Sequence, residues 1–455
     1  MNITTALLTK YNQPVPRYTS YPTVPFWKEG LYKDQWERLF GHEYEANDAA
    51  NGISIYIHLP FCESLCTYCG CNKKITLQHS VEETYIETIL AEWKLYCALM
   101  TTKPVIRELH LGGGTPTFFS PENLVNLLSR LFETATIHPE REFSFEGHPN
   151  NTTKEHLQAL YTIGFRRVSF GVQDHNPEVQ RVISRIQPLE RVQQVILDAR
   201  EIGYESVNTD LIYGLPLQTP ESMEKTIRQT IELRPDRIAF YSYAHVPWTS
   251  RAQRLFDEHD LPSAEIKMQL YRLSKKLFQE AGYIDIGMDH FALPHDDLYR
   301  AKTDGTLHRN FMGYTLHPTN MLIGLGVSAI SDAGMGYAQN EKTLHDYYDV
   351  IGKGELAVTK GYFLTDEDKA FGKYILDISC RGKTSFREED LTLLKQWSFP
   401  LLEDLENDGL IILDETGLEV TEKGSHFIRN ICFAFDLHVH RKKTVSSAPL
   451  FSKAI

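Results

Sequence analysis

The sequence predicts an α/β fold: a TIM-like, partial βα barrel with an N-terminal arm and a small, mainly helical C-terminal domain. Three observations predict it. From about residue 52, short β-rich runs alternate with longer helical patterns, as in a parallel sheet built from βα units. A helix–glycine–aromatic–strand theme recurs at 160–171, 199–214 and 279–291. Polar residues follow successive expected strands, where a barrel would gather them. An open doubly wound sheet is the alternative architecture.

Residues 1–50 are expected to form an arm or lid over the carboxyl ends of the strands, because they are rich in Tyr, Pro and Trp and show no βα alternation. The first residues lack the apolar core of a secretory signal and the Arg-rich pattern of a transit peptide. No apolar run approaches the roughly 20 residues that span a bilayer. We therefore expect a cytoplasmic protein without stable membrane insertion.

Residues 51–364 are predicted to form the barrel domain with segments that cover the substrate. Helical patterns are clearest at 81–100 and 189–203. The expected strands are 53–59, 106–111, 142–147, 166–171, 206–214 and 237–244.

Residues 365–455 turn mainly helical and end in a short β-like stretch followed by a helix. This order is typical of a small winged-helix-like module. A structural role is favoured over DNA binding, because 47 basic against 60 acidic residues give a net charge of -13. We expect no nucleic-acid partner.

Four of the seven cysteines fall within ten residues, at positions 62, 66, 69 and 71. Such crowding in a reducing compartment indicates metal ligation rather than disulfides. Cys62, Cys66 and Cys69, spaced by four and three after the first strand, suit three irons of a [4Fe-4S] cluster with the fourth iron open. A structural zinc site that uses Cys71 or a nearby His is the alternative. If the fourth iron is open, Cys71 is not a ligand, and it lies near the substrate or is a buried structural thiol.

Glycines and polar residues mark the following strand ends. Gly112, Gly113, Gly114, Thr115 and Pro116 come directly after the second strand, where bare backbone groups can approach a ligand. Arg185 is expected on the helix after the fourth strand. Taken singly, each polar residue is equally well explained as a structural group whose hydrogen bonds are satisfied within the protein. Polar residues at consecutive strand ends, however, favour a ligand site. The later strand ends carry Glu146, Gln173, Asp174, Asp210, Ala244 and His245.

The cysteine spacing on this loop resembles the radical S-adenosylmethionine (SAM) superfamily. The resemblance implies that SAM chelates the open iron and that the reduced cluster cleaves it to methionine and a 5′-deoxyadenosyl radical. Tyr68 then matches the aromatic position that packs on the adenine of SAM. The segment 113–116 matches the glycine-containing element that binds the amino end of SAM.

The resemblance becomes closer over nearly the whole chain. The chain is similar to the oxygen-independent coproporphyrinogen III oxidase family through 16–22 (PRYTSYP), 56–58 (YIH), 70–73 (GCNK), 171–174 (GVQD), 210–216 (DLIYGLP), 287–292 (GMDHFA) and 326–331 (GVSAIS). This family converts two propionates of coproporphyrinogen III to vinyl groups, which gives protoporphyrinogen IX.

The family resemblance also implies cofactor and partner assignments. Two SAM molecules, an electron donor such as flavodoxin or ferredoxin, and a monomeric enzyme are expected. Tyr56 and Cys71 are the candidate catalytic residues, and Arg17, Lys73 and Arg309 are candidate cations for substrate carboxylates, with a surface charge as the alternative reading. The matching SAM-contacting positions are Tyr56, Gly113, Gly114, Thr115, Glu146, Gln173, Arg185, Asp210, Ala244 and Ile330.

Two departures from the family pattern stand out. Glu146 is followed by Gly147, His148 and Pro149 where the family has Val-Asp-Pro, and Met312 stands where some members have Gln. The second departure predicts the loss of a polar contact to the second SAM or to the substrate. A haem chaperone of the same lineage is the main rival function, and an anaerobic haem-degrading methyltransferase is a third. The PRYTSYP segment, Cys71 and the 309–314 sequence favour the oxidase over the chaperone.

Overall fold

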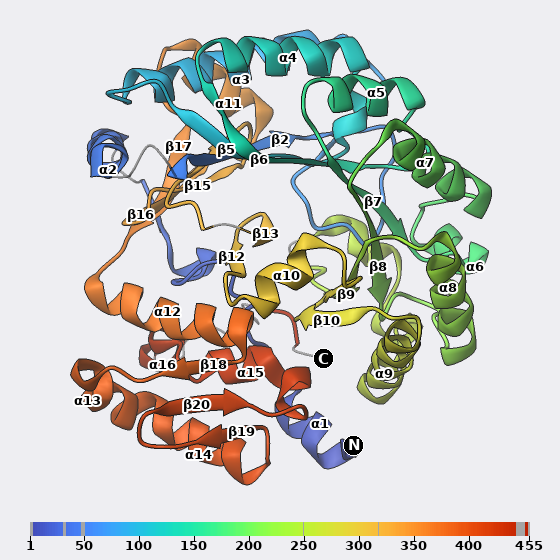
Figure 1. The fold of residues 1–455 in the computed structure, drawn as a ribbon, viewed down its shortest axis with the longest axis vertical. Coiled ribbons are helices and arrows are strands. Elements are labelled where there is room, and N and C mark those ends of the chain that lie inside the picture. The colour runs from blue at the N-terminus through green and yellow to red at the C-terminus, as the bar shows by residue number, and fades with distance from the viewer. Residues whose placement is uncertain are drawn as a thin grey trace.

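The computed structural model describes residues 3–30, 33–46, 51–248, 250–316, 318–442 and 451–453. Its main body is a strongly curved sheet with helices along its outer side (Figure 1). Seven neighbouring strands run parallel in the order β14-β2-β5-β6-β7-β8-β9, and antiparallel strands extend both edges. The two outermost strands of the sheet do not pair with each other, so the barrel is partial.

The strands of this sheet are short at both edges and long in the middle. In the parallel part they are β14 Leu322–Leu325, β2 Ile53–Leu59, β5 Val105–Gly113, β6 Thr136–Gly147, β7 Arg167–Gln173, β8 Ser206–Tyr213 and β9 Arg237–Ser242. At the edges they are β11 His290–Ala292, β10 Ile284–Gly287, β15 Ile330–Asp332, β16 Gly336–Asn340, β17 Val358–Phe363 and β1 Lys28–Glu29.

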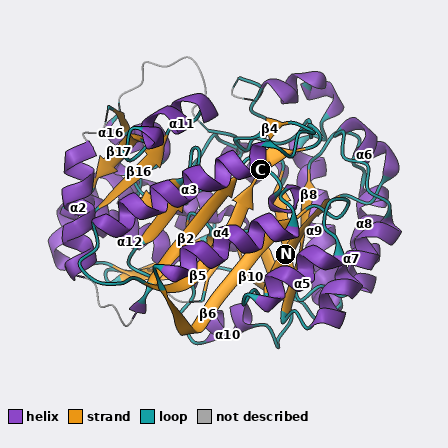
Figure 2. Ribbon diagram, turned by 90° about the horizontal axis from the view of Figure 1, so that it is seen from above, coloured by secondary structure: helices purple, strands orange, loops and turns teal. Residues whose placement is uncertain are grey.

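Amphipathic helices cover the outer face of the sheet, and α3 and α4 lie across β2 and β5 when the molecule is seen from above (Figure 2). Apolar residues of these helices and of the strands form one large core. The helices that connect or flank the strands are α3 Val81–Ala98, α4 Pro121–Glu133, α5 Lys154–Thr162, α6 Pro177–Val182, α7 Leu189–Ile202, α8 Pro220–Leu233, α9 Ala264–Glu280, α10 Asp297–Thr303 and α11 Leu344–Gly352.

The two ends of the chain meet on one side of the barrel. From the N-terminal segment come α1 Thr5–Tyr11 and α2 Lys33–Ala46, and Lys10 of α1 pairs with Asp404 and Asp408 at 2.7 and 2.6 Å. Strand β1 of the same segment joins the edge of the main sheet through β17. The C-terminal elements are α12 Asp366–Arg381, β18 Lys383–Ser385, α13 Leu391–Leu393, α14 Phe399–Asn407, β19 Ile411–Leu413, β20 Gly417–Val420, α15 Ile428–Phe433 and α16 Leu437–Arg441.

The structure confirms the predicted βα alternation. The first strand has the predicted bounds, and the glycines of the recurring theme, Gly164, Gly203 and Gly282, have φ values of 111°, 111° and 89°. Since this left-handed conformation suits glycine, each one ends a helix before the next strand. The strand predicted to end at residue 244 ends at Ser242.

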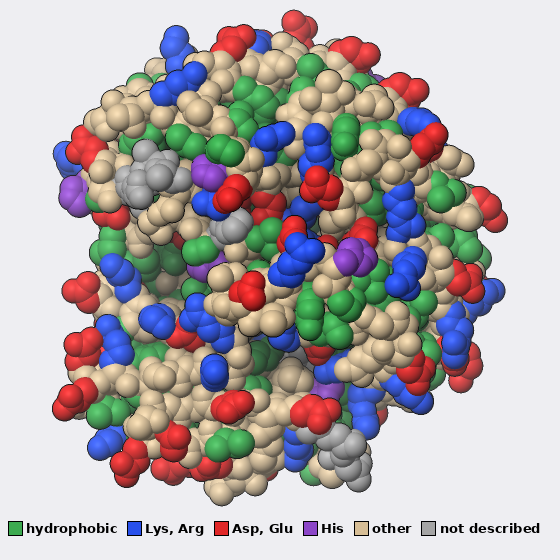
Figure 3. Space-filling model, in the orientation of Figure 1, with side chains coloured by type: hydrophobic (Ala, Val, Ile, Leu, Met, Phe, Trp, Pro, Cys, Tyr) green, Lys and Arg blue, Asp and Glu red, His purple; other side chains and the backbone are tan. Residues whose placement is uncertain are grey.

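The distribution of surface charge and the lengths and polarity of the helices agree with the mixed polar and apolar composition of the sequence. Acidic and basic side chains are interspersed over the face shown in Figure 3. Among the described residues, no helix is both long and apolar enough to cross a bilayer.

Candidate functional site

The cysteines lie on a closed loop at the carboxyl end of β2. The loop starts in β3 Phe61–Cys62 and ends in β4 Lys74–Ile75, and these two short strands pair in parallel. The Lys74 amide donates to the Pro60 carbonyl at 2.8 Å, and the Thr76 amide donates to the Cys62 carbonyl at 3.0 Å. These bonds fasten both ends of the loop, so its cysteines stay near the strand end.

A cavity of about 250 Å³ lies beside this loop, over the carboxyl ends of the parallel strands. It brings together twelve of the residues that the sequence singled out, from five separate segments of the chain. They are Cys62, Cys66, Tyr68, Cys69, Cys71, Gly113, Gly114, Thr115, Glu146, Gln173, Arg185 and Asp210. We call this space the cofactor cavity.

The sulfur atoms face donors that suit thiolates. The Thr115 hydroxyl donates to Cys62 Sγ at 3.4 Å, and Arg185 Nη1 donates to Cys66 Sγ at 3.5 Å. A hydrogen bond from Cys71, helped by the charge of Lys73, lowers the pKa of the Cys69 thiol to about 6, whereas burial raises the pKa of Cys62 to about 11. Cations and hydroxyl donors around three cysteines fit an iron–sulfur cluster, which carries negative charge on its sulfurs.

Within the described ranges, no three His, Cys, Asp or Glu side chains already stand in a metal-binding arrangement. The fit to a cluster therefore rests on the cavity that the three cysteines share and on the donors around it.

At the end of β5, neighbouring atoms of the protein leave no room for a side chain on Gly113 or Gly114. A Cβ on Gly114 would lie 2.5 Å from the Pro60 carbonyl oxygen, and one on Gly113 would lie 2.8 Å from the His58 ring. A Cβ on Gly147 would lie 2.8 Å from the Thr152 hydroxyl. The close packing of β5 against the end of β2 thus explains Gly113 and Gly114 without a ligand, and the packing around Gly147 explains the departure at this position.

Two carboxyl groups, Glu146 and Asp210, face the cofactor cavity from neighbouring parts of the sheet; both side chains are partly exposed, that of Glu146 by 46%. Burial and the charge of Glu146 raise the pKa of Asp210 to about 7. Burial acts in the same direction on Glu146, but hydrogen bonding and charge from His110 outweigh it and lower the pKa of Glu146. Ser169 and Asn208 both donate to Asp210 Oδ1, at 2.9 and 2.7 Å. Near neutral pH the pair offers both a hydrogen-bond acceptor and a carboxyl proton.

Three of the expected cofactor contacts do not line the cofactor cavity: Tyr56, Ala244 and Ile330. The Tyr56 hydroxyl contacts His58 Nδ1 at 3.1 Å, and its ring stacks on His110. The Ala244 carbonyl accepts from Gln253, which also donates to the Tyr68 carbonyl at 2.7 Å. Ile330 lies in β15, just past the carboxyl end of β14. Ala244 and Ile330 thus follow the carboxyl ends of β9 and β14, whereas Tyr56 lies in the middle of β2, and all three are outside the cavity wall.

The expectation that Arg185 lies on a helix is wrong. Helix α6 ends at Val182, and Ser184 adopts a left-handed φ of 53° that turns the chain. In this turn, Arg185 Nη2 donates to the Gly171 carbonyl at 2.5 Å, which aims the guanidinium at Cys66. A helical position would not have brought it there.

The cavity wall also contains residues that the sequence analysis did not name, chiefly Ile212, Tyr241 and Asn151, together with His148 from the departure after Glu146. Ile212 follows Asp210 by two positions on β8, and side chains alternate along a strand. The same alternation places Tyr241 inward on β9, so strict period-two counting could have found both.

The three candidate cations lie in different settings. Lys73 lines the cofactor cavity and donates to the Cys69 carbonyl at 3.0 Å. Arg17 pairs with Asp289 at 3.6 Å and donates to the Ser242 carbonyl. Arg309 is not a surface charge, because its Nε and Nη1 atoms are buried.

The comparisons with known proteins agree with this geometry. Residues 56–230 match the family model of the radical SAM superfamily. The oxygen-independent coproporphyrinogen III oxidase of Escherichia coli is 40% identical over 99% of this chain and 98% of the relative, and that of Pseudomonas aeruginosa is 38% identical over 95% of each.

A solved structure of the E. coli coproporphyrinogen III oxidase, described as a radical SAM enzyme, is 37% identical and covers 94% of this chain and 100% of its own, with a TM-score of 0.87. The chain therefore belongs to the oxygen-independent coproporphyrinogen III oxidase family of the radical SAM superfamily.

Proposed function

We propose that this protein converts two propionate side chains of coproporphyrinogen III to vinyl groups without O2, giving protoporphyrinogen IX in haem biosynthesis. Near full-length similarity to oxidases of that name supports the reaction. The observation that carries the proposal is the cofactor cavity, in which three cysteines, the glycine turn and two carboxyl groups face one space. The haem chaperone and the methyltransferase are less favoured, because the curated relatives of this chain carry the oxidase name.

Cys62, Cys66 and Cys69 would hold the [4Fe-4S] cluster in this cavity. SAM bound beside it would supply the radical that removes a hydrogen from the substrate. Gly113, Gly114 and Thr115 would offer backbone and hydroxyl groups to SAM, and Tyr68 would pack against its adenine. Glu146, Gln173, Arg185, Asp210, Ala244 and Ile330 complete the proposed contacts, shared between two SAM molecules.

The protein's own groups set the conditions for the reaction. Asp210, held at Oδ1 by Ser169 and Asn208, keeps Oδ2 available to a cationic or hydroxyl group of a ligand. Tyr56 and Cys71 are the proposed catalytic residues beside the substrate. The Tyr56–His58 contact continues through His58 Nε2 to the Asn72 carbonyl at 2.8 Å, which links β2 to the segment that carries Cys71. Such a chain holds the Tyr56 hydroxyl and the backbone next to Cys71 before substrate binds.

The wider assignments follow from the same proposal. The enzyme would act as a cytoplasmic monomer and receive electrons from a protein such as flavodoxin or ferredoxin. Residues 1–50 would cover the cavity, 51–364 would form the catalytic barrel, and 365–455 would be an appended, winged-helix-like domain.

The test is an anaerobic assay of the protein reconstituted with iron and sulfide, supplied with a strong reductant, SAM and coproporphyrinogen III. Chromatography should detect 5′-deoxyadenosine together with the divinyl product. Cleavage of SAM without any vinyl product would reject the substrate assignment, and retained product formation by protein that holds only zinc would reject the cofactor assignment.

A further inference from the structure

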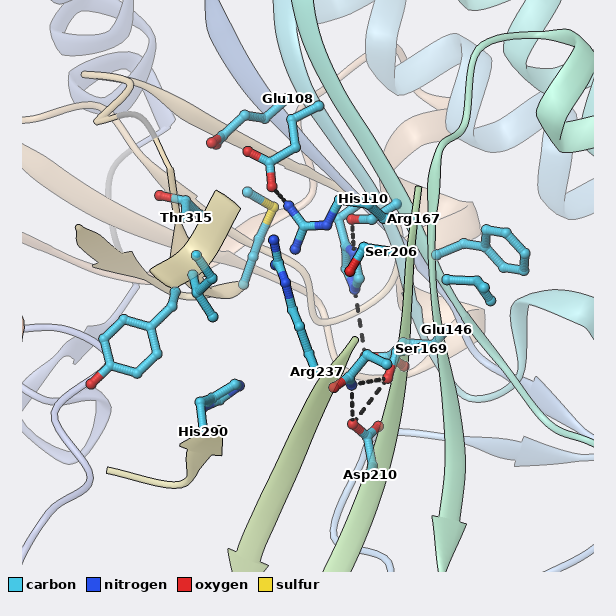
Figure 4. A pocket seen from close by; sticks show the side chains of 18 of the residues that line it. Glu108, His110, Glu146, Arg167, Ser169, Ser206, Asp210, Arg237, His290 and Thr315 are labelled. Carbon is cyan, nitrogen blue, oxygen red and sulfur yellow. Dashed lines mark hydrogen bonds and ion pairs between the residues drawn. The ribbon is translucent and has the colours of Figure 1, made fainter. Parts of the chain in front are cut away.

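Glu146 lies between two cavities. It lines the cofactor cavity, and it also lines a second cavity of about 130 Å³, which shares Asp210 and Tyr241 with the first. His110 and Ser144 line the second cavity and are not among the residues that line the cofactor cavity. Figure 4 shows the His110, Glu146 and Asp210 side chains close to one another in the second cavity. Glu146 is therefore the group through which His110 can influence a ligand of the cofactor cavity.

His110 is held by its neighbours on both sides in the sheet. The pairing of β2 with β5 sets Tyr56 beside His110, and the pairing of β5 with β6 sets Ser144 on its other side. Paired residues of neighbouring strands point to the same face of a sheet. The Tyr56 ring stacks on the His110 ring, with centroids 6.0 Å apart, and Ser144 Oγ lies 2.8 Å from His110 Nδ1. These contacts leave Nε2 as the ring nitrogen that faces Glu146.

The surroundings of the His110 ring decide which nitrogen carries a proton. Its Nε2 atom lies 3.5 Å from Glu146 Oε1. If Nε2 were bare, its lone pair would face the carboxylate oxygen, and the two would repel each other. With the proton on Nε2, the ring donates toward Glu146, and Nδ1 can accept from the Ser144 hydroxyl. The ring therefore presents an N–H to Glu146 whether it is neutral or charged.

The protein holds each oxygen of Glu146 with a separate donor. His110 faces Oε1, and the Gly113 amide donates to Oε2 at 3.3 Å. A Cβ on Gly112 would lie 3.2 Å from the carboxyl carbon, so the backbone of β5 also approaches the group closely. The Glu146 side chain nevertheless stays 46% exposed. Fixed donors on one side and an open side toward a cavity suit a carboxylate that accepts hydrogen bonds from a ligand.

We infer that His110 is a positioning residue, which holds the Glu146 carboxylate in place for hydrogen-bond donors of SAM. This inference rests on the proposed function, in which Glu146 contacts SAM, and it adds a residue that acts on SAM only through Glu146. Hydroxyl and ammonium groups are the donors of SAM that a fixed carboxylate would accept. The competing account is that His110 only fills the space between Tyr56 and Ser144.

The experiment measures equilibrium binding of SAM to the anaerobically reconstituted protein by dialysis, with the iron content as a check on the cluster. His110→Phe keeps an aromatic ring against Tyr56 but removes the donor, so it should bind SAM about tenfold more weakly than the wild type. His110→Gln loses the ring but keeps an N–H near the position of Nε2, so it should stay within about threefold of the wild type. His42→Phe is the matched control and should bind SAM normally, since His42 is exposed on α2 beside Glu43.

A double-mutant cycle tests whether His110 acts through Glu146. In a Glu146→Ala protein, the further change His110→Phe should weaken SAM binding by less than about twofold, because the side chain that His110 holds is gone. A space-filling role would instead reduce binding by the same factor in both backgrounds.

The outcomes separate the positioning role from the proposed function. If the wild-type protein binds no SAM, the proposed function fails. If it binds SAM, the positioning role is refuted and the proposed function stands when His110→Phe binds like the wild type, when His110→Gln binds as weakly as His110→Phe, or when the two changes of the cycle multiply. Should His110→Phe fail to fold, His110→Met replaces it, since Met is similar in length to Gln but has no donor; equal SAM binding by the Gln and Met variants would refute the positioning role.

Discussion

Two carboxyl groups, the fully buried Glu92 and the partly exposed Asp210, have pKa values raised to about 7, mainly by their removal from water, yet their surroundings differ. Glu92, on α3, accepts hydrogen bonds from the Gly326 amide at 2.8 Å and from Asn340 and Tyr347 at 2.6 Å each. These three donors reach both of its oxygens. Asp210 lines the cofactor cavity, and its two described hydrogen bonds both reach Oδ1. A raised pKa therefore does not identify a functional carboxyl group; its remaining capacity for hydrogen bonds does.

The largest expected effect is loss of the iron–sulfur cluster from the cofactor cavity, which Asp210 lines. Cys66→Ala should lose the iron–sulfur cluster and form neither 5′-deoxyadenosine nor vinyl product, because two thiolates do not hold a cubane. Iron and sulfide analysis with product chromatography measures both losses. Cys97→Ala is the control, since Cys97 lies on α3 and contacts Thr134 away from the cavity. A Cys66→Ala protein with normal iron content would remove Cys66 from the ligand set.

Asp210→Asn should lower kcat/KM for SAM about tenfold to hundredfold, which is the typical cost of losing a hydrogen bond to a charged group. Its free energy of unfolding should stay within about 1 kcal/mol of the wild type, since the free oxygen faces a cavity. Steady-state kinetics and denaturant unfolding measure the two quantities. A variant with unchanged kinetics would mean that the free oxygen of Asp210 contacts no ligand.

Glu92→Gln should lower the stability of the protein and leave its kinetics unchanged, the reverse of Asp210→Asn. The amide cannot accept at both positions, so one of its three donors is left unsatisfied, at a cost of about 1–3 kcal/mol in the free energy of unfolding. Denaturant unfolding monitored by circular dichroism measures this loss. The kcat of the folded protein should remain that of the wild type. A stability equal to that of the wild type would show that the Glu92 network is not a structural anchor.

The smallest effect, counted per pH unit, is a change in the slope of stability against pH. Because the pKa of Glu92 is raised from 4.5 to about 7 on folding, the folded state binds the proton more tightly, and stability falls as pH rises from about 4.5 to 7. Glu92→Gln should remove up to about 1.4 kcal/mol per pH unit of this slope between pH 4.5 and 7 and leave the slope above pH 8 unchanged. Unfolding free energies at pH 5, 6, 7 and 8 measure the difference between the two proteins. Parallel curves would indicate that Glu92 does not titrate in this range.

Much of the parallel βα part of the fold could be predicted from the sequence, because its strands and helices are long and alternate regularly. Strand β2 and helix α7 have enough residues to show their period, and glycines mark the helix ends. The carboxyl ends of parallel strands meet at one edge, so the cysteines, the glycine turn and Asp210 could be expected together.

Other features depend on distant contacts. Strand β14 has four residues, too few to show a period, and it is defined by pairing with β2 from the other end of the barrel domain. The left-handed turn at Ser184, which places Arg185, is made without a glycine, so the sequence does not mark it. The burial of Arg309 arises from a neighbouring strand, where Tyr314 covers its guanidinium. Sequence alone could not distinguish this arginine from a surface charge.

The most direct test of the central claim is electron paramagnetic resonance of the reduced, anaerobically reconstituted protein with and without SAM. The three proposed cysteine ligands would leave one iron open, so added SAM should change the spectrum of a [4Fe-4S] cluster, and the Cys71→Ala protein should show the same change. A zinc-containing protein, or a cluster spectrum that is identical with and without SAM, would contradict the account.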